Sequence, residues 1–287
     1  MADAHAARDA FRDRLNAQSC VFPASVFDPL SARIAEDIGY EIGMFAGSTA
    51  SQTILGAPDY ILITLTEFAD QARRITRATP LPIMCDADHG YGNALNVART
   101  VEELEQAGIC GLSIEDTVLP EAFGSVGKAQ ISTLDEGVGK MRAAVAAKRD
   151  PRLVIAGRTS APLITDMDDC CARVQAYEAA GVDMIFVIGI KSPEQLRALS
   201  DATTLPIMLG GTPQDMRDRE MLAQHGVRIC LIGHHTIPAA AKAIHDTMFA
   251  LRNGTNPGEL TNQPDGPFMD RIMRKADHDK TRETALR

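Results

Sequence analysis

Two carboxylates separated by one residue, Asp86 and Asp88, give the strongest sign of chemistry in this sequence. They follow a short apolar run and precede Gly90 and Gly92. Alternation along a strand would point both carboxylates the same way, and the glycines would let the backbone turn tightly beside a ligand. With Glu115, which ends another apolar run, they provide the oxygen ligands that Mg²⁺ or Mn²⁺ prefers. The alternative is that the two aspartates only cap the helix that follows.

Three further polar residues also stand at the ends of apolar runs. Arg158 would bind a substrate carboxylate through two hydrogen bonds, or would form a salt bridge to Asp86 or Glu115 that only balances charge. His234 would donate to a substrate oxygen or move a proton, although a single histidine is more often structural. Ser48 would donate a hydrogen bond to a developing oxyanion, or would cap a helix.

A recurring pattern predicts how these residues come together. Four times a helical stretch ends in a glycine and a short apolar run follows, as at a helix C-cap before a buried parallel strand. With the other apolar runs this predicts eight strands, at 20–26, 42–45, 82–86, 111–114, 153–157, 184–187, 206–209 and 228–232. Eight strand–helix units without an early Gly-x-Gly-x-x-Gly turn favour a single (β/α)8 barrel over an open doubly wound sheet. The residues named above would then share the C-terminal face of the barrel.

Local signals predict helix starts and one functional loop. Asp28, Ser192 and Thr212 each precede a proline, as at an N-cap, and Thr133 and Ser192 begin capping boxes. The connection 115–132 is long and rich in glycine and polar residues, so we expect a loop over the C-terminal face, where active-site lids often lie.

We place the barrel at 1–252, beginning with a mixed-charge helix within 1–16. The segment 253–287 is then a C-terminal helical extension that contacts a neighbouring subunit.

The composition excludes several classes of protein. The chain has 287 residues, a formal net charge of −9 and a hydrophobic fraction of 45%. An acidic chain without a basic cluster does not suit nucleic acid, and no apolar stretch is long enough to span a membrane. The six cysteines lack metal-binding spacing, and the N-terminus lacks an apolar signal region. We therefore expect a cytoplasmic protein with reduced cysteines.

The ordered strand ends resemble those of the isocitrate lyase/phosphoenolpyruvate mutase superfamily. The resemblance covers roughly 19–252 and rests on DADHGYGN at 86–93, SIED at 113–116 and GRT at 157–159. Within the superfamily the chain looks most like the oxaloacetate decarboxylase branch, because of ASVFD at 24–28, GSTAS at 47–51, NALNV at 93–97 and Gly233-His234.

This resemblance implies a Mg²⁺-dependent enzyme, with Mn²⁺ as a substitute, that acts on a small α-keto dicarboxylate. It also implies a homotetramer whose subunits exchange their last helix. Carried over by position, Asp86 would bind the metal directly. Three acids would hold metal-bound waters: Asp59, Asp88 and Glu115. Three residues would contact the substrate, the first two of them catalytic: Arg158, His234 and Ser48.

The implied reaction is the decarboxylation of oxaloacetate to pyruvate and CO2 through a metal-stabilised enolate, which His234 or solvent would protonate. Lyases of the superfamily carry a Lys-x-Cys-Gly loop whose cysteine acts as general acid, but 120–132 contains no cysteine. This argues against cleavage of isocitrate or methylisocitrate. A phosphonopyruvate-type mutase or hydrolase would not need that cysteine and remains the alternative enzyme. A non-catalytic keto-acid sensor is the alternative outside enzymes.

Overall fold

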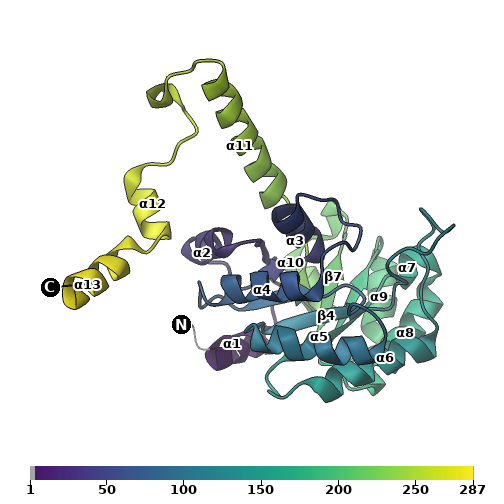
Figure 1. The fold of residues 1–287 in the computed structure, drawn as a ribbon. Coiled ribbons are helices and arrows are strands. Elements are labelled where there is room, and N and C mark those ends of the chain that lie inside the picture. The colour runs from purple at the N-terminus through teal and green to yellow at the C-terminus, as the bar shows by residue number, and fades with distance from the viewer. Residues whose placement is uncertain (1–3, 287) are drawn as a thin grey trace.

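The chain folds into a parallel barrel of eight strands. The computed structural model describes residues 4–286, and its strands are hydrogen-bonded in the order β1 to β8 (Figure 1). Their bounds are β1 Ala24–Ser25, β2 Gly43–Phe45, β3 Ile83–Asp86, β4 Gly111–Glu115, β5 Val154–Thr159, β6 Met184–Ile188, β7 Ile207–Gly210 and β8 Val227–Cys230. A parallel bridge between Val21 and Ile229 joins β8 to the start of the chain and closes the ring. The predicted (β/α)8 barrel is confirmed.

Helices surround the barrel and then leave it. Those up to β8 are α1 Ala4–Asn16, α2 Pro29–Ile38, α3 Gly47–Ala50, α4 Leu65–Thr76, α5 Ala94–Gln106, α6 Leu134–Ala147, α7 Ala161–Ile164, α8 Met167–Ala179, α9 Pro193–Asp201 and α10 Arg219–Gln224. After β8 come α11 Thr236–Arg252, α12 Gly266–Ile272 and α13 Lys275–Ala285. Short turns form η1 Ser51–Leu55, η2 Gln214–Met216 and η3 Pro257–Glu259. In Figure 1, α11 projects away from the barrel. Within residues 4–286, no helix is long and apolar enough to cross a membrane.

Two predicted elements differ from the structure. The first strand, predicted at 20–26, pairs with β2 only at Ala24–Ser25. Pro23 interrupts the ladder because it has no N–H to donate. Thr212 and Pro213 do not start a helix: Pro213 is extended, with ψ at 152°, and only the turn η2 follows. α10 begins later, where the Asp218 carboxylate accepts from the Met221 N–H at 2.7 Å.

The predicted N-caps at Asp28, Thr133 and Ser192 are present, but the capping boxes expected at Thr133 and Ser192 are not formed in the described structure, where Gln195 Oε1 accepts from the Lys191 N–H instead. Each side chain accepts a hydrogen bond from the backbone N–H three residues later. Each cap satisfies a donor that the first helical turn leaves without a partner, and so fixes where the chain turns after a strand.

The apolar core has two layers, and α1 closes the bottom of the inner one. The larger layer lies between the strands and the surrounding helices. The smaller layer fills the barrel and includes Phe11 and Leu15 of α1. Phe11 is fully buried and packs so tightly on the start of β4 that a Cβ on Gly111 would lie 2.8 Å from its ring. With this end filled, a ligand site must lie at the other end of the barrel.

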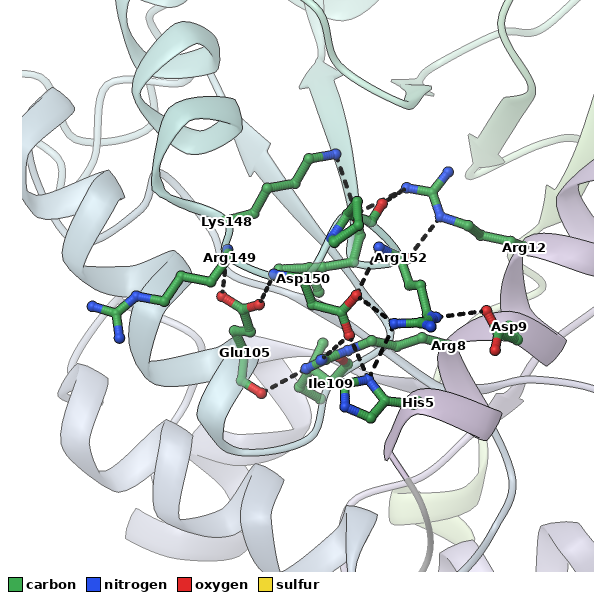
Figure 2. A network of polar contacts seen from close by, with 12 residues as sticks. His5, Arg8, Asp9, Arg12, Glu105, Ile109, Lys148, Arg149, Asp150 and Arg152 are labelled. Carbon is green, nitrogen blue, oxygen red and sulfur yellow. Dashed lines mark hydrogen bonds and ion pairs between the residues drawn. The ribbon is translucent and has the colours of Figure 1, made fainter.

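A polar network holds α1 in this place (Figure 2). The buried guanidinium of Arg8 donates to Asp150 Oδ2 at 2.8 Å, to the Ile109 carbonyl at 3.0 Å and to the Glu105 carbonyl at 2.6 Å. Burial would raise the pKa of Asp150, but hydrogen bonds from the Arg152 backbone and from Arg8 hold that pKa well below its usual range. The network therefore ties the N-terminal helix to the segments before β4 and β5.

Replacing Asp150 by Asn should lower the free energy of unfolding by about 3 kcal/mol at pH 7, because buried Arg8 loses its charged partner. The pKa of Asp150 is lower in the folded state than in the unfolded state. Its ionised carboxylate therefore contributes stability above the unfolded pKa of about 3.9, and this contribution is lost as the pH falls through the folded-state pKa. Urea unfolding should thus show a smaller difference from the unsubstituted protein at pH 3 than at pH 7. Asp70→Asn, in an exposed pair with Arg73, is the control and should cost less than about 1 kcal/mol. Equal losses in the two variants would contradict the proposed role of the network.

Candidate active site

A cavity of about 530 Å³ opens at the C-terminal ends of the strands. Its walls include all seven residues predicted from the sequence: Ser48, Asp59, Asp86, Asp88, Glu115, Arg158 and His234. They come from six separate stretches of the chain, from α3 to the loop that follows β8. The barrel therefore brings the predicted site residues together, although their roles remain predictions.

Asp86 and Asp88 reach this cavity by different means. Asp86 is the last residue of β3, whereas Asp88 lies in the following turn with φ at +48°. The expectation that strand alternation aims both carboxylates is therefore wrong, because the strand has already ended at Asp86. The turn is held from β4, where the Glu115 N–H donates to the Asp88 carbonyl at 2.8 Å. This bond positions a residue whose left-handed backbone is uncommon outside glycine.

Arg158 lies between two of the carboxylates. Its Nη1 forms an ion pair with Asp86 Oδ2, and its Nη2 lies 3.3 Å from Glu115 Oε2. The guanidinium also stacks over Phe186, with its carbon 5.3 Å from the ring centroid. Burial would lower the pKa of Arg158, but Asp86 and Glu115 outweigh it and raise that pKa. The salt bridge named as an alternative is thus present, and Nε stays buried without a hydrogen-bond partner among the described residues.

Hydroxyl groups also orient the two carboxylates that pair with Arg158, those of Asp86 and Glu115. Ser113 donates to Asp86 Oδ1 at 2.8 Å, and Thr117 donates to Glu115 Oε2 at 2.7 Å. Both hydroxyls come from β4 or the residues just after it. Each carboxylate is therefore held from two sides and has little freedom to turn.

The site holds more negative than positive charge. Burial and the neighbouring Asp86 raise the pKa of Asp59, and burial raises the pKa of Glu115. Burial, together with Asp86, Glu115 and Asp59, raises the pKa of Asp88 well above its usual range. Asp88 Oδ2 is buried and, within residues 4–286, has no hydrogen-bond partner. These acids need a further cation if all are to be ionised.

A divalent cation fits this set of oxygen ligands. Hard cations such as Mg²⁺ are bound by one or two carboxylates and keep several waters. Over the described part of the chain, no three His, Cys, Asp or Glu side chains converge closely enough to hold an ion directly. The acids that line the cavity, with Asp88 Oδ2 buried and without a partner among the described residues, suit such a cation.

Ser48 and His234 stand on the rim, and neither acts as a helix cap. Ser48 lies inside α3, whose N-cap is Ala46, so the alternative that Ser48 caps a helix is wrong. His234 Nδ1 lies 2.8 Å from Ser25 Oγ, and burial lowers the pKa of His234. His235 is the N-cap residue of α11, and its Nε2 lies 2.9 Å from the Ile232 carbonyl. Of the two histidines, only His234 lines the cavity.

An apolar wall that the sequence reasoning missed lines the same cavity. Phe186, Ile188 and Leu231 belong to it, with Leu119 from the long loop. Phe186 and Ile188 are two apart on β6, and this spacing places both on the inner side of a strand. The sequence signal for this wall is the pair of apolar residues two apart in the run at 184–188. The loop residue Glu121 also reaches the cavity, which agrees with the expected loop over this face.

Replacing Gly47 by Ala should weaken cation binding, because the added methyl carbon would lie 2.5 Å from Asp88 Oδ2 and displace that carboxylate. We expect calorimetric titration with Mn²⁺ to give at least about tenfold lower affinity, the effect typical of disturbing the groups around metal ligands. Gly139→Ala in α6 is the matched control, since nothing lies within 4 Å of its added carbon. Equal affinities in the two variants would contradict the predicted role of Asp88.

Comparisons with known proteins agree with this geometry. The family model for phosphoenolpyruvate phosphomutase matches residues 11–252. A protein of Bradyrhizobium diazoefficiens named oxaloacetate decarboxylase is 54% identical over 270 residues, which cover 94% of this chain and 93% of that protein.

Solved structures show the same fold. Oxaloacetate acetylhydrolase, in complex with the inhibitor 3,3-difluorooxalacetate, has a TM-score of 0.85 and 27% identity over 97% of both chains. Phosphonopyruvate hydrolase, in complex with oxalate and Mg²⁺, has a TM-score of 0.86 over 98% of this chain and 99% of that one. At 24% identity, the second likeness shows the fold alone. The chain belongs to the phosphoenolpyruvate phosphomutase family, in the phosphoenolpyruvate mutase/isocitrate lyase superfamily.

Proposed function

We propose that this protein decarboxylates oxaloacetate to pyruvate and CO2 with the help of Mg²⁺, for which Mn²⁺ can substitute. The observation that carries the proposal is one cavity lined both by ionisable carboxyls with Arg158 and by the apolar side chains of Phe186, Ile188 and Leu231. The comparisons support the proposal, because a relative named oxaloacetate decarboxylase is 54% identical to this chain over 93% of the relative's length.

Four acids would hold the cation. Asp86 would bind it directly, which requires one Asp86 oxygen to be shared with Ser113 or Arg158. Asp59, Asp88 and Glu115 would act through bound waters. When bound, a divalent cation supplies positive charge beside the keto oxygen and so lowers the energy of an enolate.

The other residues would bind and orient the substrate. Arg158 would neutralise a substrate carboxylate, and the Ser48 hydroxyl would donate to the oxygen on which negative charge develops. The C3–C4 bond then breaks, its electron pair forms the enolate of pyruvate, and C4 leaves as CO2. A proton from His234 or solvent adds at C3. Phe186, Ile188 and Leu231 would keep water from the carboxylate that is lost, since the product CO2 carries no charge.

Three substitutions should separate these roles. Asp86→Ala should abolish both turnover and Mn²⁺ binding. Arg158→Ala should lower kcat/KM by about 100-fold, as expected when one group that stabilises developing charge is removed. His234→Gln should slow turnover and leave Mn²⁺ affinity nearly unchanged. Kinetics of pyruvate formation and calorimetry would measure these effects, and full turnover by Asp86→Ala or Arg158→Ala would contradict the site.

The reaction itself is tested by following oxaloacetate loss and pyruvate formation with Mg²⁺ present. The Asp86→Ala protein in the same buffer corrects for decarboxylation by the free cation. Parallel reactions with methylisocitrate and phosphonopyruvate test the other superfamily reactions. Faster turnover of either compound would replace the decarboxylase assignment, and binding without any turnover would favour a keto-acid sensor.

We also propose that the barrel spans 1–252 and that the C-terminal extension 253–287 contacts a neighbouring subunit of a cytoplasmic homotetramer, with a helix exchanged between subunits. The support is that α11, which leads to this extension, buries none of its residues in the single chain. Ile244, Met248 and Phe249 are 56–67% exposed on it. Such an apolar face on a projecting helix is typical of a contact between subunits.

Replacing both Met248 and Phe249 by Glu should therefore disrupt the oligomer, because the partner would have to bury two charges. Light scattering after gel filtration should show a multiple of 30.9 kDa for the unsubstituted protein and a smaller mass for the variant. Ala243→Glu adds a charge at an exposed position of α11, on the side away from Met248 and Phe249, and serves as the control. A monomeric unsubstituted protein would contradict the proposal.

A further inference from the structure

We propose that Ser25 is a positioning residue that holds the His234 imidazole in the tautomer with its N–H at Nε2, facing the cavity. The role of that N–H in catalysis rests on the proposed function. The contact itself is a property of the fold and can be tested separately.

The barrel seam creates this contact. Ser25 ends β1, and His234 follows β8, so the two residues are 209 positions apart in sequence. The Cys230 N–H donates to the Val21 carbonyl at 3.0 Å, which joins the end of β8 to the segment before β1. Ser25 Oγ and His234 Nδ1 then lie 2.8 Å apart. Closure of the barrel thus places a hydroxyl beside one nitrogen of this histidine.

Ser25 is itself held firmly. Its Cα pairs with that of Met44 in the parallel β1–β2 ladder. Its carbonyl accepts a hydrogen bond from Thr236 Oγ1 at 2.9 Å, which links the end of β1 to the first residue of α11. The hydroxyl therefore sits on a fixed strand end and not on a mobile loop, which suits a residue that orients another side chain.

The contact directs the other ring nitrogen toward the cavity. Nδ1 and Nε2 lie on opposite edges of an imidazole, and Nδ1 is taken by Ser25. His234 lines the cavity, whereas Ser25 does not. Across residues 4–286, Ser25 provides the single hydrogen bond of the His234 side chain. Nε2 is therefore the nitrogen available to a substrate.

Electrostatics selects the tautomer. Burial lowers the pKa of His234, so the neutral ring with a single N–H dominates at neutral pH. Before a cation binds, the carboxylates of Asp86 and Asp59 act on the ring from the cavity, and their negative charge favours a proton on the edge that faces them. Nδ1 then carries the lone pair, and Ser25, which can donate or accept, donates to it. The resulting Nε2–H can donate a hydrogen bond to the substrate oxygen on which negative charge develops.

A double-mutant cycle tests whether Ser25 acts through His234. We expect Ser25→Ala to lower kcat by at least about tenfold with KM nearly unchanged, since one correctly placed hydrogen-bond donor to developing negative charge contributes about 10²–10³-fold. Ser25→Thr keeps the hydroxyl and should retain most of the activity. In a His234→Gln background, Ser25→Ala should cause no further loss. Equal losses in both backgrounds would overturn the proposal.

Two further measurements distinguish a role of Ser25 in orienting His234 from a role in anchoring β1, and they test the contact separately from the reaction. Thr236→Val removes the bond to the Ser25 carbonyl but keeps the hydroxyl, so it should leave kcat nearly unchanged. If Thr236→Val reproduces the loss seen in Ser25→Ala, Ser25 only anchors the strand. Nitrogen-15 NMR of the His234 ring should show an unprotonated Nδ1 in the unsubstituted protein and a mixture of tautomers in Ser25→Ala. If the His234 ring spectrum of Ser25→Ala is the same as that of the unsubstituted protein, the positioning role of Ser25 is overturned. If the tautomer depends on Ser25 but the protein does not decarboxylate oxaloacetate, only the proposed function is overturned.

Discussion

The buried carboxylates at the ends of β3 and β4 impose the constraint on which the rest of the site depends. An ionised group moved from water into a protein interior costs several kcal/mol unless a partner compensates for the lost hydration. Asp86 and Glu115 share the guanidinium of Arg158, while Asp88 adds a further acid to the same wall. Strand register keeps these groups together, because Glu115 pairs with Arg158 across β4 and β5. The excess of acid over base is what suits the site to a divalent cation.

A site with unbalanced charge persists only where the surrounding structure is well determined. The end of the barrel opposite the cavity is well determined, because Phe11 fills the interior there and Arg8 fixes α1 through three hydrogen bonds. The turn after β3 is likewise held by the Glu115 N–H and by Lys140, whose Nζ donates to the His89 carbonyl at 3.1 Å. The left-handed turn at Asp88 is therefore stabilised by hydrogen bonds to two successive backbone carbonyls, those of Asp88 and His89.

The sequence predicted the barrel and the polar half of the site because both leave local signals. Glycines after helices mark the repeat, and Asp86, Glu115 and Arg158 stand where apolar runs end. What it could not predict depends on backbone geometry or on contacts between distant segments. The direction of the Asp88 side chain depends on the left-handed backbone conformation of that residue. The contact of Ser25 with His234 exists only because the first and last strands meet.

The apolar wall bears on which reaction this cavity favours. A leaving group that carries charge needs a proton donor or a cation beside it, whereas CO2 leaves as a neutral molecule that an apolar surface accommodates. Phe186, Ile188 and Leu231 line the cavity with the acids and Arg158, and in the described part of the chain no cysteine does. His234 also lines it, and under the proposed function His234 or solvent would supply the proton that the enolate requires at C3. A cavity that combines acids able to hold a cation, a guanidinium and an apolar surface would therefore suit the decarboxylation proposed above.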